Sequence, residues 1–296
     1  MATLPLQPRC LVFLTRFLPV ALGLGFGIYF VLTSPYRNAP LWSVWAPLLV
    51  AFTTTSGVVF PYGLNRWPEV SRYQQVSSRE VAPRVTAIVI VALLIIGGTA
   101  FIPGPEGSSW RHVALVSTLI LGGTPAAAVM EGIRRTARNE SMPTTRGQQV
   151  LVLVRLRQLL NRLLAAVGSL VALSTLAIGA SSTLEQSLPA VSLADAATNL
   201  PPQFVLIFGG AGSLLVALFY VPAATALQRR GLRLSDELFP LHNVNEAPAI
   251  LSAAENRHKL EQLLGVDRGI VADLQTGLAI LGPLLAGAAA AFLTPF

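Results

Sequence analysis

Long apolar stretches alternate with short polar segments along almost the whole chain. Each apolar stretch has roughly the 17–25 residues with which a helix crosses a bilayer. Backbone groups without partners are too costly in hydrocarbon, so these stretches are predicted to be helices rather than irregular segments. The predicted fold is therefore all-α, a polytopic membrane protein built as a bundle of seven transmembrane helices. The predicted spans are residues 17–33, 42–60, 85–103, 113–130, 163–181, 203–226 and 272–293.

The basic residues predict how this bundle is oriented. If the seven spans cross in turn, 19 of the 21 lysines and arginines fall on one side of the membrane, and only Arg37 and Arg111 fall on the other. Cytoplasmic loops carry the excess of basic residues in membrane proteins. The N-terminus is therefore expected in the cytoplasm and the C-terminus outside. Lys259 is the only lysine and alanine is abundant, as in chains from GC-rich bacterial genomes, so the expected location is a bacterial cell (inner) membrane.

The connections divide the chain into three predicted parts. Residues 1–226 form a six-span transmembrane bundle, residues 227–270 a cytoplasmic helical connection, and residues 271–296 the final transmembrane helix. Inside the connection, Asn245 can cap a helix that stops at Gly265. This connection is too small for a catalytic domain, but it has the size of a docking surface.

The fifth predicted span begins before its apolar stretch does. Residues 147–165 are helix formers without a breaker, and they run directly into the apolar residues that follow. One helix over 147–181 would be roughly 52 Å long at 1.5 Å per residue, more than the thickness of the bilayer core. Its N-terminal part is expected to project into the cytoplasm or to lie tilted at the interface.

Composition agrees with a membrane protein and limits the chemistry. Hydrophobic residues make up 53% of the chain and charged residues 12%, about half the charged share of a soluble domain. The net charge of +7 is explained by arginines that flank the spans, so no nucleic-acid partner is predicted. Cys10 is the single cysteine and there are three histidines, so no metal site and no cofactor are predicted.

A run of hydroxyl side chains in the second span is the candidate lining of a pathway. Four successive hydroxyls point to all sides of a helix, so one or two of them must face protein or water. The alternative is that they bond to carbonyls of their own helix or of a neighbouring helix. These pathway-lining candidates are Thr53, Thr54, Thr55 and Ser56.

Small residues at four-residue spacing are candidates for close helix contacts. Such residues let two helix backbones approach, either within one chain or between subunits. The last span has small residues on several faces, which suits contact with another chain. The chain is therefore expected to form a homo-oligomer or to be a subunit of a membrane complex. The packing or oligomer candidates are Gly23, Gly27, Gly209, Ser213, Gly282 and Ala286.

Four arginines on the predicted cytoplasmic face are candidates for contact with the anionic lipids of the bilayer or with a cytoplasmic protein partner. They lie at the ends of spans, where long basic side chains reach the interface, and not deep in a span as in a voltage sensor. These candidates are Arg134, Arg135, Arg155 and Arg162.

Three classes of function follow from these patterns. No ionisable residue stands in the middle of a predicted span, which disfavours an ion-coupled carrier. The hydroxyl run and the small-residue faces favour an oligomeric channel that passes ions or small solutes. The alternative is a non-catalytic permease or scaffold subunit that docks a cytoplasmic partner. An intramembrane enzyme is a second alternative, for which the sequence offers no catalytic residue.

Overall fold

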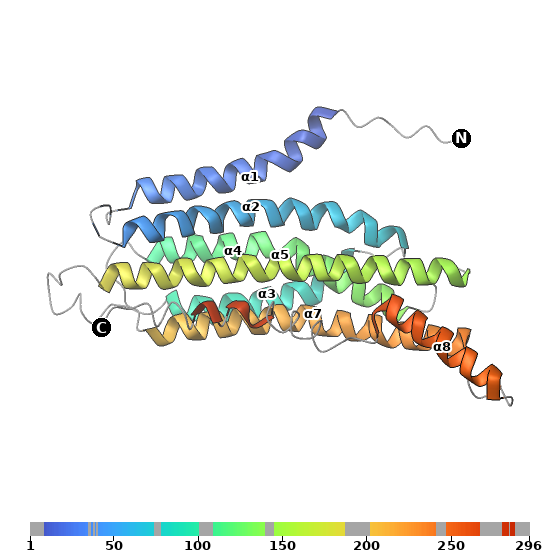
Figure 1. The fold of residues 1–296 in the computed structure, drawn as a ribbon. Helices are drawn as coiled ribbons and strands as arrows, with labels where there is room; N and C mark the ends of the chain where they lie inside the picture. Colours follow the sequence, from blue (N-terminus) through green and yellow to red (C-terminus); the bar gives the residue numbers. More distant parts are fainter. Residues whose placement is uncertain are drawn as a thin grey trace.

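The protein is described by a computed structural model that covers residues 9–34, 37, 39, 41–73, 78–100, 109–139, 145–186, 202–240, 247–266, 280–283 and 285–287. The regular elements in this part of the chain are all helical, as predicted. They are α1 (Arg9–Leu32), α2 (Trp42–Tyr73), α3 (Ser78–Ala100), α4 (Ser109–Arg138), α5 (Arg146–Gln186), α7 (Pro202–Leu238) and α8 (Ala247–Leu264), with short helical pieces at 280–283 and 285–287 (Figure 1).

Four of these helices are long and apolar enough to cross a membrane. They comprise Trp42–Arg72, Val113–Arg138, Arg146–Leu184 and Val205–Leu238, and Phe17–Leu32 forms a shorter apolar helix. The prediction of an all-helical fold is thus confirmed for the described residues, and these four helices support the prediction of a membrane protein, whereas the count of seven spans stays a prediction. The third predicted span coincides with α3 up to Ala100. Most of the seventh, 272–293, lies outside the described residues.

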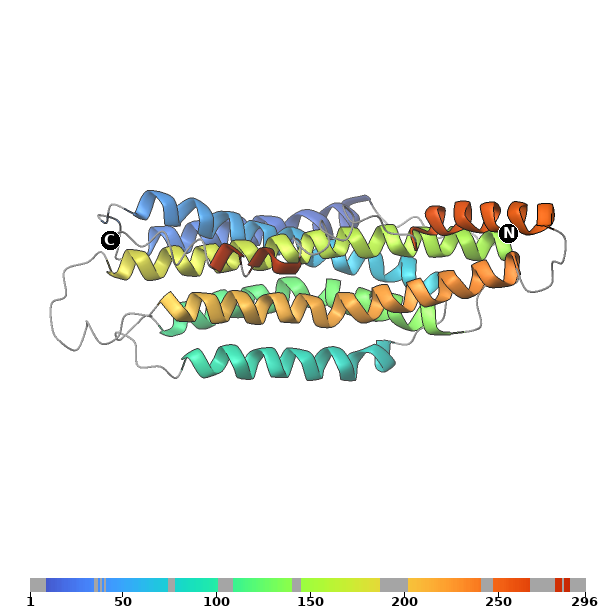
Figure 2. The ribbon, with the colours of Figure 1, turned by 60° about the horizontal axis from the view of Figure 1, so that its bottom comes forward.

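Successive helices run in opposite directions, so each end of the bundle collects alternate connections (Figures 1 and 2). One end holds the last turns of α2, α4 and α7, the first turns of α3 and α5, and all of α8. We call it the arginine-rich end, because most of the described arginines lie there, in residues 66–84, 131–162 and 227–257. The opposite end carries Arg37. The fold therefore brings together the segments that the sequence predicted to share one side of the membrane.

The two longest helices, α5 and α7, extend well beyond the thickness of a bilayer core. Helix α5 has 41 residues and a length of about 62 Å, so the predicted continuous helix over 147–181 is confirmed and is longer than expected. Helix α7 has 37 residues and continues through Leu238. It therefore crosses the predicted boundary at residue 226 without a break, because residues 227–238 contain no proline and consist largely of helix formers.

Helix α2 lies at the centre of the bundle and packs against α1, α4 and α5. Its close contact with α4 depends on Gly63, where an added Cβ would stand 2.6 Å from the backbone nitrogen of Ala126. Large side chains of α2, α4 and α5 form the core along these helices. The most deeply buried among them are Leu49, Phe52, Met130, Ile133, Leu156, Leu160 and Leu163.

Helix α8 ends as the sequence predicted. Gly265 has a φ of 61°, a left-handed conformation that glycine adopts without a steric penalty. The N–H of Val266 donates to the carbonyl of Glu261 at 2.8 Å, and the N–H of Gly265 donates to that of Gln262 at 2.9 Å. This pair of bonds is a Schellman motif, which satisfies carbonyls that the helix end would leave unpaired. The predicted cap at Asn245 lies outside the described residues.

Candidate functional site

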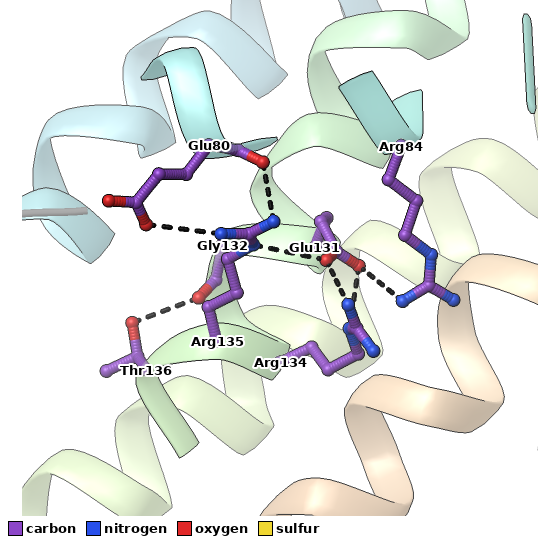
Figure 3. Close-up of polar contacts among 7 residues, drawn as sticks. All are labelled: Glu80, Arg84, Glu131, Gly132, Arg134, Arg135 and Thr136. Atoms are coloured by element: carbon purple, nitrogen blue, oxygen red, sulfur yellow. Dashed lines mark hydrogen bonds and ion pairs between the residues drawn. The ribbon is translucent and has the colours of Figure 1, made fainter. Parts of the chain in front are cut away.

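A buried carboxylate surrounded by arginines lies at the arginine-rich end, between α3 and α4. The side chain of Glu131 is only 2% exposed. Its Oε2 accepts bonds from Nη1 of Arg84 at 3.0 Å and from Nε of Arg134 at 2.8 Å. Its Oε1 accepts from Nη2 of Arg134 at 2.5 Å and, more weakly, from Nε of Arg135 at 3.4 Å (Figure 3). One carboxylate therefore holds three guanidinium groups.

Helix geometry explains the part of this arrangement that lies on α4. Arg134 and Arg135 follow Glu131 by three and four residues, so all three side chains share one face of α4. Arg84 comes from the first turns of α3. Arg135 also reaches α3, where it donates to the Glu80 carboxylate at 3.1 Å and to the Glu80 carbonyl at 2.5 Å. We call these five residues the Glu131 cluster, and it ties the start of α3 to the end of α4.

The Glu131 cluster has one more positive charge than negative charges. Three arginines face two carboxylates, and their side chains stay partly exposed, at 28% for Arg84, 15% for Arg134 and 32% for Arg135. A carboxylate that already accepts from three cations is poorly suited to act as a general base or metal ligand. The partly exposed guanidinium groups, in contrast, can bind an anionic group. Within the described part of the chain, no group of three or more His, Cys, Asp or Glu side chains is placed to hold a metal ion.

The sequence identified two members of this cluster and missed three. Arg134 and Arg135 were predicted as contacts for lipid or partner, and the structure shows both bound to carboxylates of their own chain. The Glu-x-x-Arg-Arg spacing at Glu131 was a readable signal for their pairing. Arg84 and Glu80 gave no such signal, because they meet Glu131 and Arg135 only through the packing of α3 on α4.

A second polar assembly joins the extensions of α5 and α7 to α8. We call residues 146–162, 227–238 and 247–264 the helical platform. Arg257 on α8 bonds to Asp236 on α7 and to Glu261, both at 2.8 Å, and Ser235 donates to Glu261 at 3.2 Å. Two arginines of α5 complete the assembly. Arg146 donates to the Glu237 carbonyl at 3.2 Å, and Arg157 donates to the carbonyl of Leu264.

These contacts shift the pKa of two groups on α8. The hydrogen bond to Glu261, followed by the charges of Asp236 and Glu261, raises the pKa of Arg257 above its ordinary value. The hydrogen bond from Lys259 and its charge hold the pKa of the Glu255 carboxyl below its ordinary value of 4.5. Both groups are therefore charged at neutral pH, and ion pairs stabilise the platform.

Four further arginines of the platform are exposed. Arg155 and Arg162 are exposed on α5, and Arg229 and Arg233 are exposed on α7. Arg155 also borders a polar pocket between α2 and α5, with an empty volume of about 920 Å³ that includes its open side. The predicted contact residues thus divide into a partly buried pair that bonds to carboxylates, Arg134 and Arg135, and an exposed pair, Arg155 and Arg162.

The hydroxyl run of α2 meets neighbouring helices. Thr53 is buried beside Gly27 of α1, and its Oγ1 donates to the carbonyl of Leu49 at 3.1 Å. Ser56 is buried against α4, and its Oγ donates to the Thr118 carbonyl at 2.8 Å. Thr53 and Ser56 therefore bond as the alternative interpretation of the run expects, one to a carbonyl of its own helix and the other to a carbonyl of a neighbouring helix.

The remaining two hydroxyls of the run differ from each other and from this pair. Thr54 has a buried Oγ1 for which the structure shows no hydrogen-bond partner. Thr55 is partly buried. Neither the contact of Thr53 with α1 nor that of Ser56 with α4 explains the hydroxyls of these two residues.

The predicted small-residue contacts fall into two groups. Gly23 and Gly27 face Thr53 of α2, and a Cβ at either position would collide with it. Gly209 and Ser213 are buried in α7. Gly282 faces open space and Ala286 is partly exposed, although little else of the last span is described. Of the first four, Gly27, Gly209 and Ser213 are buried and Gly23 is partly buried against α2, whereas the last two lie on a more open face.

Comparison with protein families, with curated proteins and with solved structures gives no match for this chain.

Proposed function

We propose that this protein is a non-catalytic membrane subunit that docks a cytoplasmic protein with an acidic surface. The observation that carries the proposal is the helical platform, which extends α5 and α7 beyond their apolar parts and braces them with α8. The platform presents exposed arginines on two helices, Arg155 and Arg162 on α5 and Arg229 and Arg233 on α7. Complementary charge of this kind guides the encounter between partners and selects among them.

The bracing contacts support a docking role because they fix the helices that carry the exposed arginines. Arg257 connects α8 to α7 through Asp236, and Arg157 connects α5 to the end of α8. A surface that is ordered before binding loses less conformational entropy when a partner arrives. The platform is therefore suited to receive a folded partner rather than to fold around one.

The docking proposal predicts a bound protein partner that dissociates when an exposed arginine of the platform is replaced by glutamate. The full chain would be extracted gently from its own membrane and weighed by native mass spectrometry. We expect a second protein at fixed stoichiometry, lost in Arg233→Glu but kept in the matched control Arg37→Glu at the opposite end of the bundle. A homo-oligomer with no second protein, or equal retention by both variants, would overturn the proposal.

The proposal also requires the arginine-rich end to face the cytoplasm. Single cysteines at exposed positions, Arg37→Cys and Glu237→Cys, would be made in a Cys10→Ser background. An impermeant thiol reagent added to intact cells should label residue 37 and leave residue 237 unlabelled. The reverse pattern would place the platform outside and remove a cytoplasmic partner from consideration.

An oligomeric channel in the cell membrane is the second candidate function. It is supported by the unpartnered hydroxyl of Thr54 and by the open face at Gly282, where a second copy of the chain has room to approach. If this function holds, Thr54→Ala and Thr55→Ala should change ion flux into reconstituted vesicles without changing assembly. Unchanged flux in both variants would count against the channel and leave the docking role.

A further inference from the structure

An apolar cavity opens between α3 and the helices α4, α5 and α7. Its empty volume is about 760 Å³ when the open side is included. The lining side chains are apolar except for Thr124, whose hydroxyl already donates to the carbonyl of Ile120 at 2.5 Å. Gly123 contributes part of the space, because a Cβ at this position would meet no atom within 4 Å. The cavity thus offers room and apolar contact but no free hydroxyl.

The Glu131 cluster lies at the arginine-rich end of this cavity. On α3, Arg84 stands four residues before Ile88, which lines the cavity, and on α4, Arg134 stands four residues after Met130, which also lines it. Residues four apart share one face of a helix. Both arginines bond to Glu131 in Figure 3, so their guanidinium groups come together one turn beyond the apolar lining.

The resulting site has two chemically distinct parts in line along the bundle. Its apolar part lies beside membrane-spanning portions of α4, α5 and α7, and its cationic part lies at the end of the apolar segment Val113–Arg138, where an interface is expected. Guanidinium groups bind phosphate through several donors at once. Basic pockets between transmembrane helices on the cytoplasmic side are suited to the head groups of anionic lipids.

We propose that this site binds one anionic phospholipid, with an acyl chain in the apolar cavity and the phosphate on Arg84 and Arg134. A free phosphate ion would leave the cavity unused, and a wholly apolar ligand would leave the excess positive charge unpaired. The lipid also contributes to structure, because it covers the open side of the cavity beside α3. The proposal does not depend on the docking function, since the platform lies on α5, α7 and α8.

The test measures lipid binding to the full chain by native mass spectrometry. Dioleoyl phosphatidylglycerol and dioleoyl phosphatidylcholine share their acyl chains and differ in head-group charge. The protein should bind one phosphatidylglycerol at least tenfold more tightly than phosphatidylcholine. Arg84→Gln should weaken phosphatidylglycerol binding about five- to tenfold, since one basic contact to the head group is lost. One of the exposed arginines of α5 supplies the matched control: Arg162→Gln should bind phosphatidylglycerol as the native chain does.

A second variant tests the acyl-chain part and leaves the ion pairs intact. Gly123→Leu places a side chain in the cavity and should weaken the binding of both lipids. Gly25→Leu, at another open glycine on α1, is its control. Three results would each overturn the proposal. The first is equal binding of the two lipids by the native chain, and the second is unchanged lipid binding in Arg84→Gln or Gly123→Leu. The third is inorganic phosphate that competes for the site as well as phosphatidylglycerol does.

Discussion

Replacing the buried carboxylate of the Glu131 cluster gives the sharpest test of how this bundle is held together. Glu131→Gln keeps the size of the side chain but removes the charge that three arginines share. Removing one member of a buried ion pair costs about 3–5 kcal/mol, because the partner charges stay without compensation. Here the arginines are partly exposed and water can reach them, so we expect a loss of about 2–3 kcal/mol in the free energy of unfolding.

The control variant alters a second ion pair, whose two side chains are both partly exposed. Arg66 and Glu69 form a contact of 2.9 Å on α2, and both side chains are 35% exposed. Glu69→Gln is therefore expected to cost no more than about 1 kcal/mol. Both variants would be unfolded with denaturant in the same bicelles, and hydrogen exchange would follow α3 separately.

The site of the loss is as informative as its size. Arg84 and Glu80 attach the start of α3 to α4 through this cluster, so amides of α3 should lose protection in Glu131→Gln while those of α2 keep theirs. A loss no larger than that of Glu69→Gln, or a loss of protection spread evenly over the bundle, would refute the reasoning. It would mean that apolar packing alone positions α3.

Two further predictions concern helix packing and charge on α8. Gly63→Ala should destabilise the chain by about 1–3 kcal/mol, because its Cβ would stand 2.6 Å from the backbone nitrogen of Ala126, whereas Gly123→Ala should be neutral or stabilising in the same unfolding assay. The lowered pKa of Glu255 predicts that its ion pair with Lys259 stabilises α8 above pH 4.5 and is lost as the pH falls through the lowered value. Carbon-13 NMR of labelled glutamate should show the Glu255 carboxyl titrating below 4.5, and its pKa should rise in Lys259→Met. An unchanged pKa in that variant would contradict the ion pair.

Local patterns in the sequence were sufficient to predict the helices. The length of each apolar stretch predicted the long apolar helices α2, α4, α5 and α7, because the length needed to cross a bilayer does not depend on neighbouring segments. The unbroken helix formers before the fifth span predicted the projection of α5, and Gly265 predicted the end of α8. The alternating distribution of arginines also predicted which segments meet at one end.

Which helix faces meet was decided by tertiary packing alone. Thr53 and Ser56 were predicted to line a pathway, and only the positions of α1 and α4 reveal that they lie in helix contacts. Arg84 bonds to a carboxylate 47 residues away in the chain, so no short-range spacing in the sequence could predict this ion pair. Hydropathy and helical period describe each segment by itself, whereas a buried contact depends on how two faces rotate toward each other. That rotation is set by the shapes of many side chains together.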